Sequence, residues 1–264
     1  MHAACCSTPA VIATGYKPKG TMTTLAGQKV YSVGPEDSAN VVICVYDIFG
    51  YASQTEQGAD LIASATGFRV IMPDLLQGRG APMDILPPLS EASKGMSGMD
   101  EETKKKVQER FAAVFADAGD FQKRIPDLHA LAAALRAGGA RRVGVYGLCW
   151  GGKLAILAAN AHVGDFDAIA QAHPTQFNAD DYCAVKVPVA SFPSESDNHD
   201  AQAKLIAMVD QQREIKDLCS FHSYHNMHHG WAGARANLED ADNLREFQDV
   251  YRRLADFFAR AFAT

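Results

Sequence analysis

Unbroken apolar runs alternate with segments of helical periodicity along most of the chain. The clearest run, Val41 to Tyr46, is rich in β-branched residues, which is typical of a strand buried on both faces of a helix-covered sheet. Apolar runs predict strands at residues 28–33, 41–46, 68–72, 142–146, 168–172, 187–192 and 218–224. Helices are expected at residues 54–65, 100–118, 123–137, 150–160, 200–215 and 239–262. This alternation predicts an α/β fold with a mainly parallel central sheet flanked by helices.

Two stretches lack this alternation. Residues 1–28 are rich in glycine and proline, so we expect a turn-rich N-terminal segment there. Residues 75–99 hold three prolines and four glycines, which predicts an irregular excursion from the fold. No internal repeat or linker divides the rest of the chain, so residues 29–264 are predicted to form a single domain.

The composition is that of a globular protein. The 264 residues are 47% hydrophobic and 21% charged, which is enough to build a core without disulfides. The formal net charge is −6 and no long basic run occurs, so neither nucleic acid nor an anionic membrane surface is an expected partner. No window approaches the roughly 20 apolar residues of a membrane span, and the N-terminus does not resemble a signal peptide.

The cysteines indicate a reducing environment. The six of them lie at positions 5, 6, 44, 149, 183 and 219 and form no Cys-x-x-Cys pair. Cys44 lies inside an apolar run, as a buried thiol does. We therefore expect a cytoplasmic protein without a disulfide framework. No Cys/His quartet has the spacing of a zinc site, so no metal site is predicted.

The strongest chemical signal is Gly147-x-Cys149-x-Gly151, between a predicted strand and an alanine-rich predicted helix. This is the pattern of a nucleophile elbow with cysteine in the usual serine position. Small flanking residues allow the tight turn, and the N-terminus of the following helix favours a thiolate. The alternative interpretation is a glycine-rich turn that carries an inert thiol.

A nucleophile of this kind needs a histidine base and an acid that orients it, and elbow hydrolases carry them in the chain order nucleophile, acid, histidine. Asp197 follows the predicted strand at 187–192, with Glu195 and Asp200 as neighbouring alternatives. The histidine is expected after the strand at 218–224, where the candidates are His225, His228 and His229.

Several short motifs together resemble the dienelactone hydrolase family of the α/β-hydrolase fold, from about residue 28 to the C-terminus. They are Tyr46–Gly50, Pro73–Leu75, Gly147–Gly152, Ser196–Asp197 and His229–Trp231. The double-glycine elbow and the His-Gly-aromatic tripeptide are the most specific. The resemblance implies an eight-stranded, largely parallel sheet without a large lid. It also implies a catalytic set of Cys149, Asp197 and His229.

The same resemblance implies an oxyanion hole formed by the backbone N–H groups of Ile48 and Trp150, with Phe49 beside them in the substrate site. Asp47 stands where the family has a glutamate that holds the resting thiol protonated and inactive. Asp47 is therefore either such a switch or a residue that caps a turn.

Bacterial members of the family bind a substrate carboxylate with two arginines. Gly78 occupies the position expected for the first, and Arg79 follows it directly. Arg235 lies two residues beyond the position expected for the second. Arg79 and Arg235 are thus candidates for a carboxylate clamp, and the alternative for each is an ordinary surface position.

The sequence predicts a hydrolase that cleaves an ester, lactone or thioester of a small acid, neutral or anionic, through an acyl-cysteine intermediate, with no metal or organic cofactor. A carboxylesterase or thioesterase for unrelated esters is an alternative within this class. Alternatives outside it are a non-catalytic binding protein and a redox sensor that uses Cys149. Both a monomer and a homodimer are compatible with the sequence.

Overall fold

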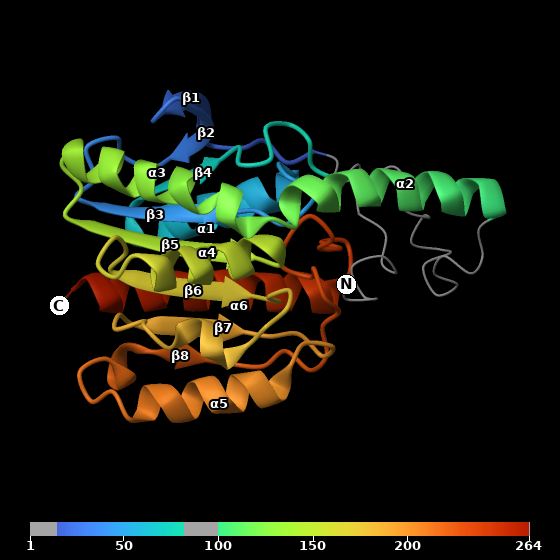
Figure 1. The fold of residues 1–264 in the computed structure, drawn as a ribbon. Coiled ribbons are helices and arrows are strands. Elements are labelled where there is room, and N and C mark those ends of the chain that lie inside the picture. The colour runs from blue at the N-terminus through green and yellow to red at the C-terminus, as the bar shows by residue number, and fades with distance from the viewer. Residues whose placement is uncertain (1–14, 82–99, 264) are drawn as a thin grey trace.

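The computed structural model describes residues 15–81 and 100–263, and these form a central sheet with helices on its two faces (Figure 1). The sheet has eight strands in the order β1-β2-β4-β3-β5-β6-β7-β8. The strands are β1 (Thr21–Leu25), β2 (Gln28–Val33), β3 (Asn40–Val45), β4 (Arg69–Pro73), β5 (Arg142–Leu148), β6 (Ala168–Ala172), β7 (Val189–Phe192) and β8 (Ser220–Phe221).

The sheet is parallel except at one edge. β1 pairs with β2 and β2 pairs with β4 in antiparallel fashion, while every pairing from β4 through β3, β5, β6, β7 and β8 is parallel. Nearly all residues of β3 and β5 are buried, because helices cover both faces of these central strands. The eight-stranded, mainly parallel α/β architecture confirms the fold class expected from the sequence.

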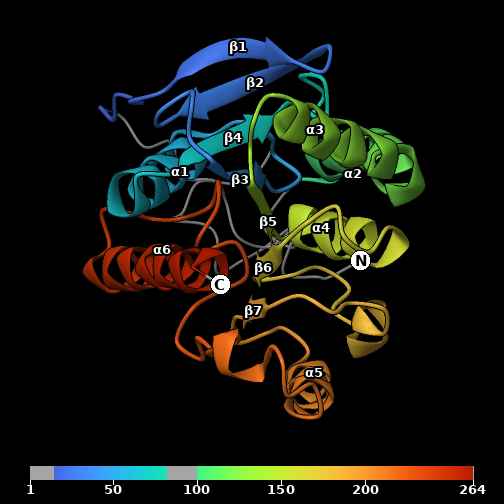
Figure 2. The same ribbon diagram turned by 90° about the vertical axis from the view of Figure 1, so that its left-hand side faces the viewer.

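The helices form two layers around this sheet. They are α1 (Ser53–Thr66), α2 (Glu101–Ala118), α3 (Ile125–Ala137), α4 (Trp150–Ala161), α5 (His199–Asp210) and α6 (Ala241–Phe262). Short 3₁₀ turns lie at η4 (Phe121–Lys123), η5 (Ala179–Tyr182) and η6 (Lys216–Leu218). The end-on view in Figure 2 shows α1 and α6 against one face and α3 and α4 against the other. None of the helices in the described part of the chain is long and apolar enough to cross a lipid bilayer.

The N-terminal segment differs from its expected turn-rich character. Residues 21–25 form β1, which pairs with β2 from Thr21 opposite Ser32 to Leu25 opposite Gln28. The two connecting residues, Ala26 and Gly27, both have positive φ, as a tight hairpin turn of the primed type requires. The first 14 residues and residues 82–99, where most of the expected irregular excursion falls, lie outside the described residues.

Two strands at the other edge are shorter than expected. β7 begins at Val189 because Pro188 has no N–H to donate, although the Pro188 carbonyl still accepts from Ile169. β8 is limited to Ser220–Phe221, with one isolated bridge further on between Ser194 and Tyr224. The loop that follows β8 is therefore long and carries the predicted histidine, while residues 193–198, between β7 and α5, carry the predicted acid.

Candidate active site

Cys149 lies in the turn between β5 and α4, at the carboxyl end of a central strand. Its φ is 50°, a value that residues with a side chain rarely adopt and that the surroundings must enforce. The Cys149 N–H donates to the carbonyl of Ala172 over 3.2 Å, and the Cys149 carbonyl accepts from Thr175 and Gly152, each over 3.1 Å. The geometry is that of the nucleophile elbow expected from the sequence.

Glycine is required on both sides of this turn because three backbone segments meet there. A Cβ atom on Gly147 would overlap the backbone carbonyl group of Gly151. A Cβ atom on Gly151 would in turn overlap the carbonyl oxygens of Val45 and Tyr46 at the end of β3. The Gly-x-Cys-x-Gly pattern thus allows α4 to begin in direct contact with β5 and β3.

Asp197 and His229 form a buried pair at the ends of the last two strands. Nδ1 of His229 lies 2.9 Å from Oδ1 of Asp197, and neither side chain is exposed. The other carboxylate oxygen of Asp197 accepts from the N–H of Ser194 over 2.7 Å and from its hydroxyl over 2.8 Å. This arrangement fixes the imidazole, places its proton on Nδ1 and leaves Nε2 as the basic nitrogen.

The alternatives to Asp197 and His229 lie elsewhere. Glu195 and Asp200 are exposed. His225 is exposed and stacks on His199 with ring centroids 4.6 Å apart. Nε2 of His228 lies 3.3 Å from the carbonyl oxygen of Arg235. Of the three candidate histidines, the structure therefore pairs His229 with the acid.

His173 is a residue of this site that sequence reasoning missed. It follows β6, its side chain is fully buried, and its ring meets the ring of His229 edge to face with centroids 5.2 Å apart. Desolvation lowers the pKa of His173 well below the usual value, so its ring is neutral at neutral pH. Neither of its ring nitrogens has a hydrogen-bond partner among the described residues. The signal in the sequence was its position directly after a strand, which it shares with Cys149.

His173 also connects the turn at Cys149 to the histidine loop, the segment 222–240 that carries His229 between β8 and α6. Its chain neighbour Ala172 accepts the hydrogen bond from the N–H of Cys149, while its own ring contacts His229. The His173 N–H donates to the carbonyl of Phe192 at the end of β7, the strand that leads to Asp197. The segments that carry Cys149, Asp197 and His229 thus meet around the end of β6.

The predicted oxyanion loop follows β3 and is fixed by Asp47, which is buried. Oδ1 of Asp47 accepts from the N–H of Phe49 over 3.0 Å, and Oδ2 accepts from the N–H of Ala234 over 2.8 Å. The carboxylate therefore ties this loop to the histidine loop. Ile48 lies in the loop and Trp150 is the first residue of α4, so both belong to segments that converge at Cys149.

The two candidate arginines have different surroundings. Arg235 is 1% exposed, and its guanidinium carbon lies 5.4 Å from the centre of the Phe49 ring. A Cβ atom on Gly230 would come within 2.8 Å of Nε of Arg235, so the glycine after His229 leaves room for this guanidinium. Arg79 instead forms an ion pair of 3.1 Å with Asp117 near the end of α2, and its side chain is 58% exposed. The Arg235 guanidinium therefore lies beside the predicted oxyanion loop, whereas the Arg79 guanidinium is paired with Asp117.

Known proteins resemble this chain in sequence and in fold. The chain matches the dienelactone hydrolase family over residues 29–262. An uncharacterised AIM2 family protein of Schizosaccharomyces pombe is 30% identical over 265 residues, covering 97% of this chain and 98% of its own length. A protein of Aspergillus violaceofuscus named hydrolase pyvD is 29% identical over 183 residues, covering 68% of this chain and 65% of its own length.

The fold is likewise found in a solved structure. The crystal structure of a dienelactone hydrolase from Anabaena variabilis has a TM-score of 0.56 at 15% identity, covering 92% of this chain and 96% of that one. The family match extends from β2 to the end of α6 and includes the elbow, the acid and the histidine motif. The chain therefore belongs to the dienelactone hydrolase family and is a hydrolase of the α/β-hydrolase fold.

Proposed function

We propose that this hydrolase cleaves an ester or lactone of a small acid through an acyl-cysteine intermediate, with Cys149 as nucleophile, His229 as base and Asp197 as its orienting acid. The observation that carries the proposal is the elbow geometry of Cys149 together with the buried His229–Asp197 pair. Enzymes of this architecture carry their nucleophile in a strained turn at a helix N-terminus, and Cys149, which is 3% exposed, lies in such a turn. A buried acid–histidine pair at the same sheet edge supplies the general base.

In the first half-reaction, Nε2 of His229 takes the thiol proton of Cys149, and the sulfur attacks the carbonyl carbon of the substrate. The developing oxyanion accepts hydrogen bonds from the N–H groups of Ile48 and Trp150. When the tetrahedral intermediate collapses, the bond to the leaving oxygen breaks and His229 returns its proton to that oxygen. An alcohol leaves, or the ring of a lactone opens, and a thioester on Cys149 remains.

In the second half-reaction, His229 removes a proton from water, and the resulting hydroxide attacks the thioester carbonyl carbon. The carbon–sulfur bond breaks and the acid is released, and the proton held by His229 passes to the sulfur, which restores the Cys149 thiol and the neutral imidazole. Asp197 balances the imidazolium charge that forms in each half-reaction, because its carboxylate already holds Nδ1. Its two hydrogen bonds from Ser194 keep that carboxylate in place.

We propose that the acid part of the substrate is small and carries a carboxylate, which Arg235 binds. Arg235 is the one of the two candidate arginines whose guanidinium lies against Phe49, next to the predicted oxyanion loop. A buried guanidinium binds carboxylates strongly because its charge is little screened by water. Arg79, paired with Asp117 at the surface, is not assigned a role in binding substrate.

The test compares hydrolysis of a short-chain p-nitrophenyl ester and of a dienelactone by the parent protein and four variants. Cys149→Ala and His229→Ala are expected to lose roughly 10³-fold or more in kcat, since members of a triad act as a unit. His225→Ala and His228→Ala are the matched controls and should retain most activity. Circular dichroism checks that each variant folds. Activity retained by Cys149→Ala, or an equal loss in His228→Ala, would refute the assignment.

A further inference from the structure

A second cluster of ligand-type side chains lies at the end of α4 that is remote from Cys149. His129 comes from α3, His162 follows the last residue of α4, and Asp165 lies in the loop that leads to β6. One potential ligand atom from each residue lies within 4.8 Å of the other two. The twelve residues of α4 span roughly 18 Å, so this cluster is far from the elbow at the other end of the helix.

The three side chains are arranged as ligands with an accessible side. Nδ1 of His129 lies 2.6 Å from Oδ2 of Asp165, and the rings of His129 and His162 have centroids 4.2 Å apart. Neither ring nitrogen of His129 has an aligned hydrogen-bond partner within the described ranges, despite the short contact with the carboxylate. The His129 side chain is 14% exposed, whereas His162 is open to solvent. An ion can therefore reach the cluster from the side of His162.

The chemistry of these side chains suits this use. A neutral imidazole offers a lone pair to a metal ion, and the adjacent carboxylate of Asp165 supplies negative charge.

The loop that carries Asp165 is held firmly against α3. The guanidinium of Arg136, near the end of α3, donates to the carbonyl oxygen of Asp165 over 3.0 Å and forms an ion pair of 2.9 Å with Asp167. The N–H of Val143 in β5 donates to the same Asp167 carboxylate over 2.7 Å. Because these contacts fix the backbone on both sides of the cluster, little ordering is needed when an ion binds.

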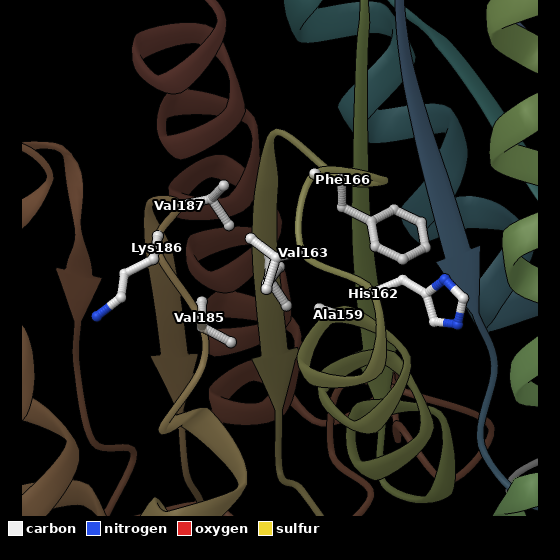
Figure 3. A pocket seen from close by; sticks show the side chains of 9 residues that line it. Ala159, His162, Val163, Phe166, Val185, Lys186 and Val187 are labelled. Carbon is white, nitrogen blue, oxygen red and sulfur yellow. The ribbon is translucent and has the colours of Figure 1, made fainter.

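The lysine in the neighbouring pocket points away from the cluster. Figure 3 shows the shallow pocket beside the cluster, with His162 and Phe166 on one side and Lys186 on the other. The Lys186 side chain extends away from His162, so its ammonium group does not compete for the carboxylate. Phe166 is buried and its ring lies 6.1 Å from that of His129, which gives the cluster an apolar wall.

We propose that His129, His162 and Asp165 bind a divalent transition-metal ion of the Zn²⁺ class. Two imidazoles and one carboxylate are ligands that such ions prefer, and water completes the coordination. With bonds of about 2.0–2.2 Å, tetrahedral ligand atoms lie roughly 3.3–3.6 Å apart. The 2.6 Å contact between Nδ1 of His129 and Oδ2 of Asp165 must therefore widen by about 1 Å, while the exposed His162 side chain turns toward them. The ion would clamp α3 to the loop after α4 and take no part in hydrolysis.

Zinc binding is measured by isothermal titration of the protein after its thiols have been alkylated, with labelling of the buried Cys149 confirmed by peptide mapping. Alkylation keeps the catalytic Cys149, Asp197 and His229 from acting as a competing site. The parent protein is expected to bind one Zn²⁺ ion. Binding should weaken by about tenfold to 100-fold or more in each of the variants His129→Ala, His162→Ala and Asp165→Asn. Loss of a residue that only hydrogen-bonds to a metal ligand already weakens binding by that much.

The matched control is His225→Ala, which removes a ring from a different histidine pair, the stacked His199 and His225. Within the part of the chain that the structure describes, that pair has no third ligand residue beside it, so its loss should leave zinc affinity unchanged. Zn²⁺ should also raise the Tm of the parent and of His225→Ala but not of His162→Ala. No saturable binding to the parent, or equal affinity in the parent and all three ligand variants, would overturn the proposal.

Discussion

Cys149 has a backbone conformation that by itself costs about 1–3 kcal/mol, and packing against glycine enforces it. Gly151→Ala should therefore lower the free energy of unfolding by about 1–3 kcal/mol or more, because its Cβ would meet the fixed carbonyl oxygens at the end of β3. Urea unfolding followed by circular dichroism measures this.

Gly152→Ala is the matched control in the same helical turn. Its added Cβ would approach the Gly147 carbonyl oxygen only to 3.2 Å, a contact that small shifts relieve. The control should therefore lose much less stability than Gly151→Ala. Equal losses of stability in the two variants would show that the backbone contact at Gly151 does not enforce the positive φ of Cys149.

Asp47 accepts backbone N–H groups with both carboxylate oxygens, which favours a structural role over control of the thiol. In Asp47→Asn, an amide NH₂ would face one of these N–H donors, so we expect a loss of about 1–3 kcal/mol in the free energy of unfolding. The rate of Cys149 alkylation by iodoacetamide at neutral pH should change little. Cys44 does not interfere, since it is fully buried and burial raises its pKa to about 12.

The alternative role for Asp47 gives the opposite result. If the carboxylate holds the resting thiol protonated, Asp47→Asn would accelerate alkylation several-fold, because a like charge beside a thiol disfavours the thiolate. Peptide mapping by mass spectrometry assigns the alkylated residue. Faster labelling of Cys149 without loss of stability would contradict the structural role.

The buried ring of His173 predicts a specific dependence of stability on pH. Its pKa is depressed in the folded protein, so the unfolded chain takes up a proton as the pH falls below about 6.5 while the folded chain does not. Protonation therefore stabilises the unfolded state, and stability falls as the pH is lowered from 7 towards 5. This residue contributes up to about 1.4 kcal/mol per pH unit.

His173→Asn removes that contribution, so its free energy of unfolding should vary less steeply over the same pH interval than that of the parent. His225→Asn, a substitution at an exposed histidine, serves as the control and should keep the parent slope. Denaturant titrations at several pH values give the slopes. Identical slopes in the parent and His173→Asn would mean that His173 titrates normally.

At the scale of elements, the contact between α1 and α6 supports the histidine loop. Gly58 on α1 lies against the ring of Tyr251 on α6, and a Cβ at position 58 would overlap that ring. The Tyr251 hydroxyl donates to the carbonyl of Ala232 over 2.8 Å, three residues beyond His229. The helix packing and the position of the base are thus coupled through one tyrosine.

Replacement of a helical glycine by alanine ordinarily stabilises a protein by about 0.5–1 kcal/mol. Gly58→Ala should do the reverse and lower the free energy of unfolding by about 1–3 kcal/mol, because the Tyr251 ring must move. We expect kcat to fall as well, since the displaced ring no longer holds the Ala232 carbonyl. A more stable variant with unchanged kcat would contradict this coupling.

Most elements could be predicted because their apolar patterns are long and are bounded by clear turn residues. Helix α3 begins where a proline suits a first turn, and β3 is an unbroken apolar run after Asn40 that is rich in β-branched residues. The hairpin that forms β1 was missed because its turn is Ala26-Gly27, which lacks the asparagine or aspartate typical of such turns. β1 is also mostly exposed, so its sequence carries little apolar signal.

At the scale of the whole molecule, the candidate site residues gather at the carboxyl edge of the parallel strands. Asp47 follows β3, Cys149 follows β5, His173 follows β6, Asp197 follows β7 and His229 lies in the loop after β8. The crossover helices return the chain to the opposite edge each time, so residues far apart in the sequence meet here. The proposed metal ligand His162 lies at that opposite edge, at the far end of α4.

Sequence motifs indicated those candidate site residues whose proposed roles depend on local chain geometry, such as Cys149 in its turn. Other features depend on contacts between distant segments, which a single sequence does not reveal. The contact of His173 with His229 spans two strand ends. The ion pair between Arg79 and Asp117 depends on where α2 ends. The cluster of His129, His162 and Asp165 brings together three separate segments.

The central claim, an acyl-cysteine intermediate on Cys149, is tested most directly by trapping that intermediate. The protein is mixed with a short-chain p-nitrophenyl ester, quenched in acid within the first turnovers and analysed by peptide mass spectrometry. The acyl group is expected on Cys149 in the parent and should be absent from the Cys149→Ala variant. Acylation of a different residue, or ester turnover by Cys149→Ala at the parent rate, would contradict the account.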